Sequence, residues 1–292
     1  MQCLYGQHYI PQKKGEVVIE VIAHNYLKNN SLKVTRKTNR KNKPLAVVYF
    51  DKNGNTLESF SYRFAHINDL NMLNYVESYE YNQNNLLISK FEFGNDRDNI
   101  LNHSYTTDYL YNDDNVIGEY KYSTWSHDTI IKAEFEYNNR GNKSKTIYKP
   151  GYYIEQTYTA NDKLATVRQI YDNKLQWEYI YTYTDSTRIV NFRTLRNDGK
   201  DYERNKTIKH KNGVAIESED ICIGYSGIDE KTKYYYTKIG LLEKVEYYER
   251  YMPDQKYNIV SYIDFKTKGY VKDINIITKI NTELNLNFCS GY

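Results

Sequence analysis

Histidine is the side chain used most often for acid–base catalysis and metal binding near neutral pH, so the histidines are the first candidates for chemistry. They are His8, His24, His66, His103, His127 and His210. No two are spaced i, i+4 or framed as HExxH. His127 lies near Trp125 and beside Asp128 in STWSHDT. Histidine, carboxylate and nucleophile fall on separate segments, so we predict that His66, His103 and His127 each stand alone, outside any catalytic cleft.

Three further motifs approach known sites but lack a required feature. Gly224-Tyr225-Ser226-Gly227 is followed by Ile228, where a nucleophile elbow requires glycine. The Asp-rich stretches NDRDN and YNDDN lack the ligand spacing of an EF-hand calcium loop. Cys3, Cys222 and Cys289 have unrelated spacings, which favour neither a metal pair nor a disulfide framework. The sequence therefore predicts a non-enzymatic protein with no catalytic residue, no bound metal and no cofactor.

Charge and hydropathy narrow the choice of partners. Lys and Arg total 40 against 37 Asp and Glu, a net charge of +3, which is too balanced for a nucleic-acid partner. The one basic run, within 28–43, suits a solvated strand and loop better than a site for RNA or an anionic glycan. No stretch reaches the ~18 apolar residues of a membrane span. Cys3 leaves two locations open: an ordinary cytoplasmic N-terminus, or a mature lipoprotein of the cell envelope.

A repeat of about 26 residues organises most of the chain. Each copy has an aromatic residue directly before a polar turn; these aromatics are Phe50, Tyr81, Tyr111, Tyr137, Tyr158, Tyr183 and Tyr236, with His210 filling the one gap. Tyrosine is unusually abundant, with 34 copies, and few runs favour helix. A period of this length is typical of an array of supersecondary units.

Each unit is predicted to be a β-hairpin. In AEFEYNNRGN, apolar and charged residues alternate with a period of two, and Asn138 to Gly141 then tolerate the positive φ angles of a reversal. We expect Gly54 and Gly141 to have positive φ. The fold class is therefore all-β: an antiparallel β-hairpin repeat array of ~16 strands, forming one long twisted and curled sheet.

We predict a single domain, since no Pro- or Ser-rich linker divides the chain. It comprises an N-terminal strand and basic segment over 1–44, hairpin repeats over 45–265 and C-terminal strands over 266–292. EVVIEVIA (16–23) is a continuous β-branched run that suits a buried strand, and 274–280 alternates as a strand does. The segment 64–77 is interpreted as a short helix or a loop.

The turn sequences resemble a known repeat. YFDKNGNTLESFSY and YNNRGNKSKTIY are similar to the YD repeat of Rhs and teneurin proteins, and the resemblance covers roughly residues 45–265. Asn often replaces Asp, and the glycine is lost from several copies. A second resemblance is to hairpin-repeat antitoxins with Asn-Gly turns. These families imply a curled antiparallel sheet used for encapsulation, adhesion or neutralising a partner, and the Asn, Tyr, Lys and Ile bias resembles a Bacteroidetes-type genome.

The predicted function is non-enzymatic protein binding, as an immunity-type or envelope-associated protein. The alternative is a carbohydrate-binding or carbohydrate-acting envelope protein that uses exposed Tyr and Trp, with a glycan as partner. One face, including Ile131, Phe135, Tyr137, Val245 and Tyr247, is expected to be buried. Interface energy concentrates in Tyr, Trp and Arg, so we predict a binding surface at Tyr122, Trp125 and Trp177, with 28–43 as a steering element. The other interpretation of both Trp residues is hydrophobic plugging of the sheet ends.

Overall fold

The computed structural model describes residues 15–28, 35–37, 45–64, 71–95, 101–113, 115–194, 202–211, 214–223, 228–269, 271 and 273–284. These residues form nineteen strands and one helix: β1 (Val17–Lys28), β2 (Thr35–Lys37), β3 (Ala46–Phe50), β4 (Thr56–Phe64), β5 (Asn71–Tyr81), β6 (Leu87–Asn95), β7 (Leu101–Asn112), β8 (Asn115–Ser123), β9 (Thr129–Tyr137), β10 (Lys143–Lys149), β11 (Tyr152–Tyr158), β12 (Leu164–Tyr171), β13 (Lys174–Tyr183), β14 (Thr187–Thr194), β15 (Tyr202–Lys211), β16 (Val214–Ile223), β17 (Asp229–Tyr236), β18 (Leu242–Arg250), β19 (Asn258–Lys268) and α1 (Ile274–Leu284). The prediction of an antiparallel hairpin array is confirmed.

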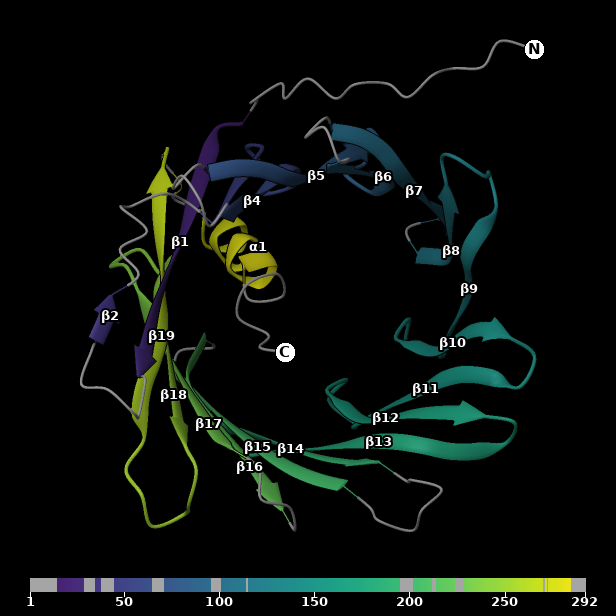
Figure 1. Cartoon of the computed structure of the whole chain (residues 1–292). Coiled ribbons are helices and arrows are strands. Elements are labelled where there is room, and N and C mark those ends of the chain that lie inside the picture. The colour runs from purple at the N-terminus through teal and green to yellow at the C-terminus, as the bar shows by residue number, and fades with distance from the viewer. Residues whose placement is uncertain are drawn as a thin grey trace.

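The sheet closes on itself. Every strand from β3 to β19 pairs antiparallel with the next along the chain, and β1 lies between β19 and β3, which makes a ring of eighteen strands. Val21 of β1 stands opposite Phe265 on one side and Ala46 on the other. Figure 1 shows the resulting barrel, with β2 outside the ring beside β1. The N-terminal strand therefore joins the two ends of the hairpin array.

The repeat turns share one hydrogen-bond geometry. In five of them the first turn residue donates its N–H to the carbonyl four residues later and accepts from the N–H three residues later; these first residues are Asp51, Asn82, Asn138, Thr159 and Thr237. The residue that donates back has positive φ: 73° at Gly54, 60° at Asn85, 78° at Gly141, 56° at Asp162 and 90° at Gly240. This left-handed position explains why only Gly, Asn and Asp fill it, and the prediction for Gly54 and Gly141 is confirmed.

The first turn residue also braces the turn with its side chain. The Oδ1 atom of Asp51 accepts the N–H groups of Asn53 and Asn55, both at 2.8 Å. Asn138 Oδ1 accepts those of Arg140 and Asn142 in the same way, at 2.9 and 3.0 Å. Asp and Asn are interchangeable here because both carry the Oδ1 atom on Cγ, at the distance from the backbone that an Asx turn requires.

The tyrosine before each turn joins neighbouring units. Its hydroxyl donates to the carbonyl at or next to the start of the preceding unit's return strand: Tyr81 to Thr56 (3.0 Å), Tyr111 to Leu87 (2.7 Å), Tyr137 to Val116 (2.5 Å), Tyr158 to Lys143 (2.7 Å), Tyr183 to Leu164 (2.9 Å) and Tyr236 to Ala215 (2.8 Å). Phenylalanine would pack equally well but leave the carbonyl without this donor. The hydroxyl is the reason for tyrosine at this position.

Helix α1 lies inside the ring, against β1, β3, β18 and β19 (Figure 1). Its Ile277, Ile280 and Leu284 are buried in one hydrophobic core with strand residues such as Phe50 and Val245. The prediction of C-terminal strands over 266–292 is wrong for this segment, and β19 ends at Lys268. Ile277, Ile280 and Leu284 recur with helical spacing, and burial of that stripe overrides the weak strand preference of the β-branched residues.

The inner face of the barrel is defined here as the face that carries α1. Because directly opposed residues share a face, the pairings allow it to be followed from strand to strand. Ile131, Phe135 and Val245 all lie on it. Val245 is fully buried, whereas Ile131 is 38 % exposed. The prediction that this face is buried is correct beside α1 and wrong at Ile131.

The EVVIEVIA segment is the expected buried strand, with Val17, Ile19 and Val21 in the core. A second buried cluster lies on the outer face of β3–β7 and contains Val47, Phe60, Val76, Phe93 and Leu101. From 64–77, residues 71–77 belong to β5, while 65–70 lie outside the described residues. The described part of the chain has no helix long and apolar enough to cross a membrane.

Candidate functional site

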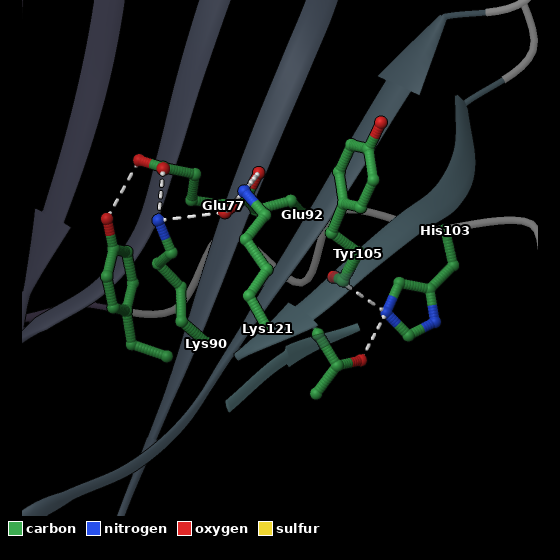
Figure 2. A network of polar contacts seen from close by, with 8 residues as sticks. Glu77, Lys90, Glu92, His103, Tyr105 and Lys121 are labelled. Atoms are coloured by element: carbon green, nitrogen blue, oxygen red, sulfur yellow. Dashed lines mark hydrogen bonds and ion pairs between the residues drawn. The ribbon is translucent and has the colours of Figure 1, made fainter. Parts of the chain in front are cut away.

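A network of charged side chains lies on the inner face of β5–β8 (Figure 2). Lys90 Nζ is 3.2 Å from Glu77 Oε1 and 3.0 Å from Glu92 Oε1. Lys121 donates to both carboxylate oxygens of Glu92, at 2.8 and 2.9 Å, and also lies over the Tyr105 ring. Glu77 and Glu92 stand directly opposite each other in the β5–β6 register, and the ammonium groups of Lys90 and Lys121 neutralise the two carboxylates.

The network holds its members in their charged forms. Burial opposes ionisation of Glu92, but hydrogen bonds from Lys121, Tyr75 and Lys90 outweigh it and lower the pKa of this carboxyl. Burial likewise opposes the charge on Lys90, while Glu77 and Glu92 raise its pKa above the ordinary value. Catalytic acids and bases need pKa values near the working pH. These groups instead remain ionised near neutrality, which suits a structural ion network.

The two candidate histidines that the structure describes, His103 and His127, lie apart. His103 is on the outer face, stacked on Phe93 with ring centroids 4.9 Å apart, and its Nε2 lies 2.9 Å from the Thr106 hydroxyl oxygen. Burial lowers its pKa. His127 occupies the β8–β9 loop with φ of 56°. His66 lies outside the described residues. In the described ranges no three His, Cys, Asp or Glu side chains are grouped as metal ligands.

The structure brings two of the three predicted binding residues to one place. Tyr122 is the second-last residue of β8, on the outer face, and donates its hydroxyl to Asp108 Oδ2 at 3.2 Å; Trp125 follows in the loop 124–128. Trp177 is on β13, on the inner face, half-buried beside Tyr179 at 5.3 Å. Four strands separate β8 from β13, so Trp177 belongs to another surface. The side chains of the predicted 28–43 steering segment lie outside the described residues.

The loop around Trp125 is held by its own hydrogen bonds. The Ser123 hydroxyl oxygen accepts the N–H groups of Trp125 (3.3 Å) and Ser126 (3.5 Å). His127 N–H donates to the Ser123 carbonyl at 2.9 Å, and Ser123 N–H to the Asp128 carbonyl at 3.1 Å. Trp125 is nevertheless 70 % exposed. A braced loop thus presents an indole ring to solvent.

The two ends of the barrel differ. The turn rim is the end formed by the repeat turns, and the loop rim is the opposite end, formed by the connections β4–β5, β6–β7 and so on to β18–β19. Four strongly exposed large apolar side chains belong to the loop rim: Trp125, Tyr251 (64 %), Met252 (57 %) and Ile130 (52 %). The turn rim and the strand ends beside it also expose apolar side chains: Ile239 (49 %), Leu110 (45 %), Ile117 (40 %) and Tyr235 (40 %). On the loop rim, Trp125 and Ile130 belong to the β8–β9 connection and Tyr251 and Met252 to the β18–β19 connection, so they form two separate groups. Exposed apolar groups of this kind mark interaction surfaces when they lie together.

Sequence reasoning missed the inner-face network altogether. Its one signal is Lys90 and Glu92, which stand two residues apart and therefore share a face. Their partners Glu77 and Lys121 come from neighbouring repeat units, at distances along the chain that vary with the irregular repeat. The pairing register is needed to bring them together.

Neither a known protein family nor a curated protein sequence matches this chain. Among solved structures, a porin-like protein from Bacteroides uniformis has a similar fold, with 10 % identity and a TM-score of 0.46 over 88 % of this chain and 98 % of that chain. The structure of TcdB2-TccC3-Cdc42 matches 80 % of this chain and 13 % of its own, with 10 % identity and a TM-score of 0.38. TcdB2-TccC3 without its hypervariable C-terminal region has 13 % identity and a TM-score of 0.30, covering 70 % of this chain and 13 % of that one. Scores in this range carry no functional inference.

Proposed function

We propose that this chain is a non-enzymatic protein-binding repeat protein, of an immunity type or associated with the cell envelope, whose partner docks at the loop rim around Trp125. The observation that carries the proposal is the 70 % exposure of Trp125 in a loop braced by its own hydrogen bonds. Trp and Tyr dominate the energy of protein interfaces, and a loop whose backbone is already braced loses little entropy on association.

The surroundings of Trp125 support this role. Ile130, in the first residues of β9, is 52 % exposed and extends the apolar surface. Tyr122 is the second-last residue of the neighbouring strand β8, and its hydroxyl donates to Asp108. An interface anchor is strongest when apolar and hydrogen-bonding groups surround a central aromatic ring and exclude water. The barrel behind these residues is a closed ring, so it offers a rigid support.

The ionisation of the inner-face network supports a non-enzymatic role, because Glu92 and Lys90 stay charged and paired near neutral pH. The resemblance of the turns to the YD repeat of Rhs and teneurin proteins is consistent with a partner that this sheet holds or neutralises. An immunity-type protein would be encoded beside its toxin. An adhesive or envelope-associated protein would be exported.

The test is capture with matched baits. Wild-type protein, Trp125→Ala and Ile239→Ser are each immobilised and exposed to extract of the native organism, and retained proteins are compared quantitatively. Ile239 is the control because it is an exposed apolar residue on the turn rim. We expect at least one protein to be retained by wild type and by Ile239→Ser and to be lost from Trp125→Ala at unchanged melting temperature. Retention of the same proteins by all three baits would contradict the proposed surface.

A further inference from the structure

The inner face of β11–β14 carries a strip of aromatic residues that the loop-rim proposal does not use. Trp177, Tyr179 and Tyr181 follow one another on β13, and Phe192 stands opposite Tyr179 on β14. The Tyr179 ring centroid lies 5.3 Å from that of Trp177, 6.4 Å from that of Tyr181 and 4.6 Å from that of Phe192. These rings form a continuous apolar surface, all of it only half-buried.

Three polar atoms on the same face have no hydrogen-bond partner in the described part of the chain: Gln156 Oε1, Arg188 Nε and Thr194 Oγ1. The register places all three on the inner face, with Thr194 opposite Trp177 and Arg188 opposite Tyr183. They are spread over the face, since Arg188 and Thr194 lie near opposite ends of β14. Only Arg188 carries a charge, so it is the group that can orient an anionic ligand.

The strip is also electropositive. The inner-face residues of β11–β15 include no carboxylate, as the register and sequence show. Arg188 of β14 has no ion pair among the described residues, whereas on the neighbouring β15 Arg204 is 3.0 Å from Asp220 and Lys206 stands directly opposite Asp220. An unpaired guanidinium beside aromatic rings is suited to a carboxylate, which it can bind through two parallel hydrogen bonds.

Solvent reaches this side of the barrel. Tyr171, on the same face of β12, is 43 % exposed. The hydrophobic core that holds α1 includes no residue of β10–β15. In Figure 1 the helix lies against the opposite wall of the ring. A ligand on the strip would therefore not have to displace α1.

We propose that this inner-face strip binds an acidic oligosaccharide, a chain of sugars that includes uronic acids. The flat faces of Trp177 and Tyr179 stack on the C–H faces of pyranose rings. Arg188 binds the carboxylate of a uronic acid. A nucleic acid is less well matched, because tight binding would require a cation for each of many phosphates, and Arg188 is the one cation of the strip without an ion pair among the described residues.

The proposal is tested by isothermal titration calorimetry with oligomers of galacturonate, mannuronate and glucuronate and with their carboxyl-reduced counterparts. We expect a uronate oligomer to bind about tenfold or more tightly than its reduced form, a preference worth about 1.4 kcal/mol. Arg188→Gln should abolish that preference, and Trp177→Ala should weaken both forms. Arg168→Gln is the matched control: it is on the outer face of β12, and Arg193 still pairs with Glu178 at 2.8 Å.

Each variant is checked by thermal unfolding, and Trp177→Phe replaces Trp177→Ala if the latter fails to fold. Three results would overturn the proposal: no uronate oligomer binding at millimolar concentration, equal binding of acidic and reduced oligomers, or tighter binding of single-stranded DNA. Trp125→Ala should bind the oligosaccharide as wild type does. This separates the strip from the loop rim.

Discussion

Substitution of Gly54 and Gly141 by alanine distinguishes two destabilising effects: the strain of a left-handed non-glycine residue and close packing against α1. Both glycines occupy the same turn position, with φ of 73° and 78°. A Cβ at Gly141 would meet nothing within 4 Å, whereas at Gly54 it would lie 3.1 Å from Ile276 Cγ2 and 3.4 Å from the Ile276 carbonyl oxygen of α1. Gly141→Ala therefore introduces only the strain of a left-handed alanine. Gly54→Ala introduces the same strain and a contact with Ile276 that is tighter than an ordinary van der Waals contact.

The magnitudes differ enough to measure. A left-handed non-glycine residue costs about 1–2 kcal/mol, and overpacking against a helix adds about 1–3 kcal/mol. For a chain of this size each kcal/mol lowers the melting temperature by about 2–4 °C. Gly141→Asn should cost less than Gly141→Ala, because Asn85 holds the same position at 60° in a sibling turn. Valine at either glycine should be at least as damaging as alanine.

Urea unfolding of Gly54→Ala, Gly141→Ala, Ile276→Ala and the Gly54→Ala/Ile276→Ala double variant provides the assay. We expect Gly54→Ala to lower the free energy of unfolding more than Gly141→Ala does. The double variant should lose less than the sum of the Gly54→Ala and Ile276→Ala losses, because Ile276→Ala removes the tight contact. Equal losses at the two glycines with no coupling to Ile276 would refute the contact between this turn and α1. An Asn variant as unstable as the Ala variant would refute the left-handed explanation.

Three further substitutions test other parts of the structure by thermal unfolding. Tyr111→Phe and Tyr183→Phe should each lower the free energy of unfolding by about 1 kcal/mol, and the two losses should add when combined. Tyr251→Phe, at an exposed position, is the control and should leave it unchanged. No loss in the first two variants would contradict a stabilising role for the bonds from tyrosine hydroxyls to the neighbouring units. Glu92→Gln should lower the free energy of unfolding by about 3 kcal/mol, because Lys90 and Lys121 lose their charged partner. Glu134→Gln, in an exposed pair with Lys132, should lower it by at most ~1 kcal/mol. Similar losses in the two variants would contradict a buried network. Burial and the nearby Glu77 raise the pKa of Glu283 despite Lys279, so the stability it contributes is present at low pH and lost as pH rises through the raised pKa. Glu283→Gln should therefore stabilise the protein at pH 7, and the gain should vanish below about pH 4; a gain independent of pH would contradict this.

The hairpins could be predicted from sequence because their determinants are local. Period-two alternation around Phe135 and a turn that needs positive φ at Gly141 lie within one repeat unit. Closure of the ring could not be predicted in the same way. It depends on β1 pairing with β19, more than 200 residues away, and no local pattern encodes that choice.

Helix α1 shows how a local pattern misleads. Ile274, Ile276, Thr278 and Ile280 alternate as in a strand, yet Ile277, Ile280 and Leu284 make a helical stripe in the same segment. Whether the segment forms a strand or a helix depends on the surface it packs against, here the inner face of β1, β3, β18 and β19. The hydrogen bonds from the tyrosine hydroxyls to the neighbouring units, by contrast, are indicated by the sequence. Tyrosine rather than phenylalanine recurs before the turns, which indicates a partner for the hydroxyl.

The predicted binding residues lie on two different surfaces for a similar reason. Trp125 follows the end of β8 and lies in a loop beside Tyr122. Trp177 is predicted to share that surface, yet it is within β13 and faces inward. Strand parity across the irregular repeats decides which face a residue occupies, and each bulge beside a turn resets that parity.

Hydrogen–deuterium exchange of the protein with and without its captured partner tests the central claim most directly. If the partner docks at the loop rim, exchange should slow in residues 123–130, where the Trp125 loop enters β9. The repeat turns on the turn rim should exchange at the same rate in both states. Slowed exchange confined to the turn rim, or to the strands of the inner face, would contradict the proposed binding surface.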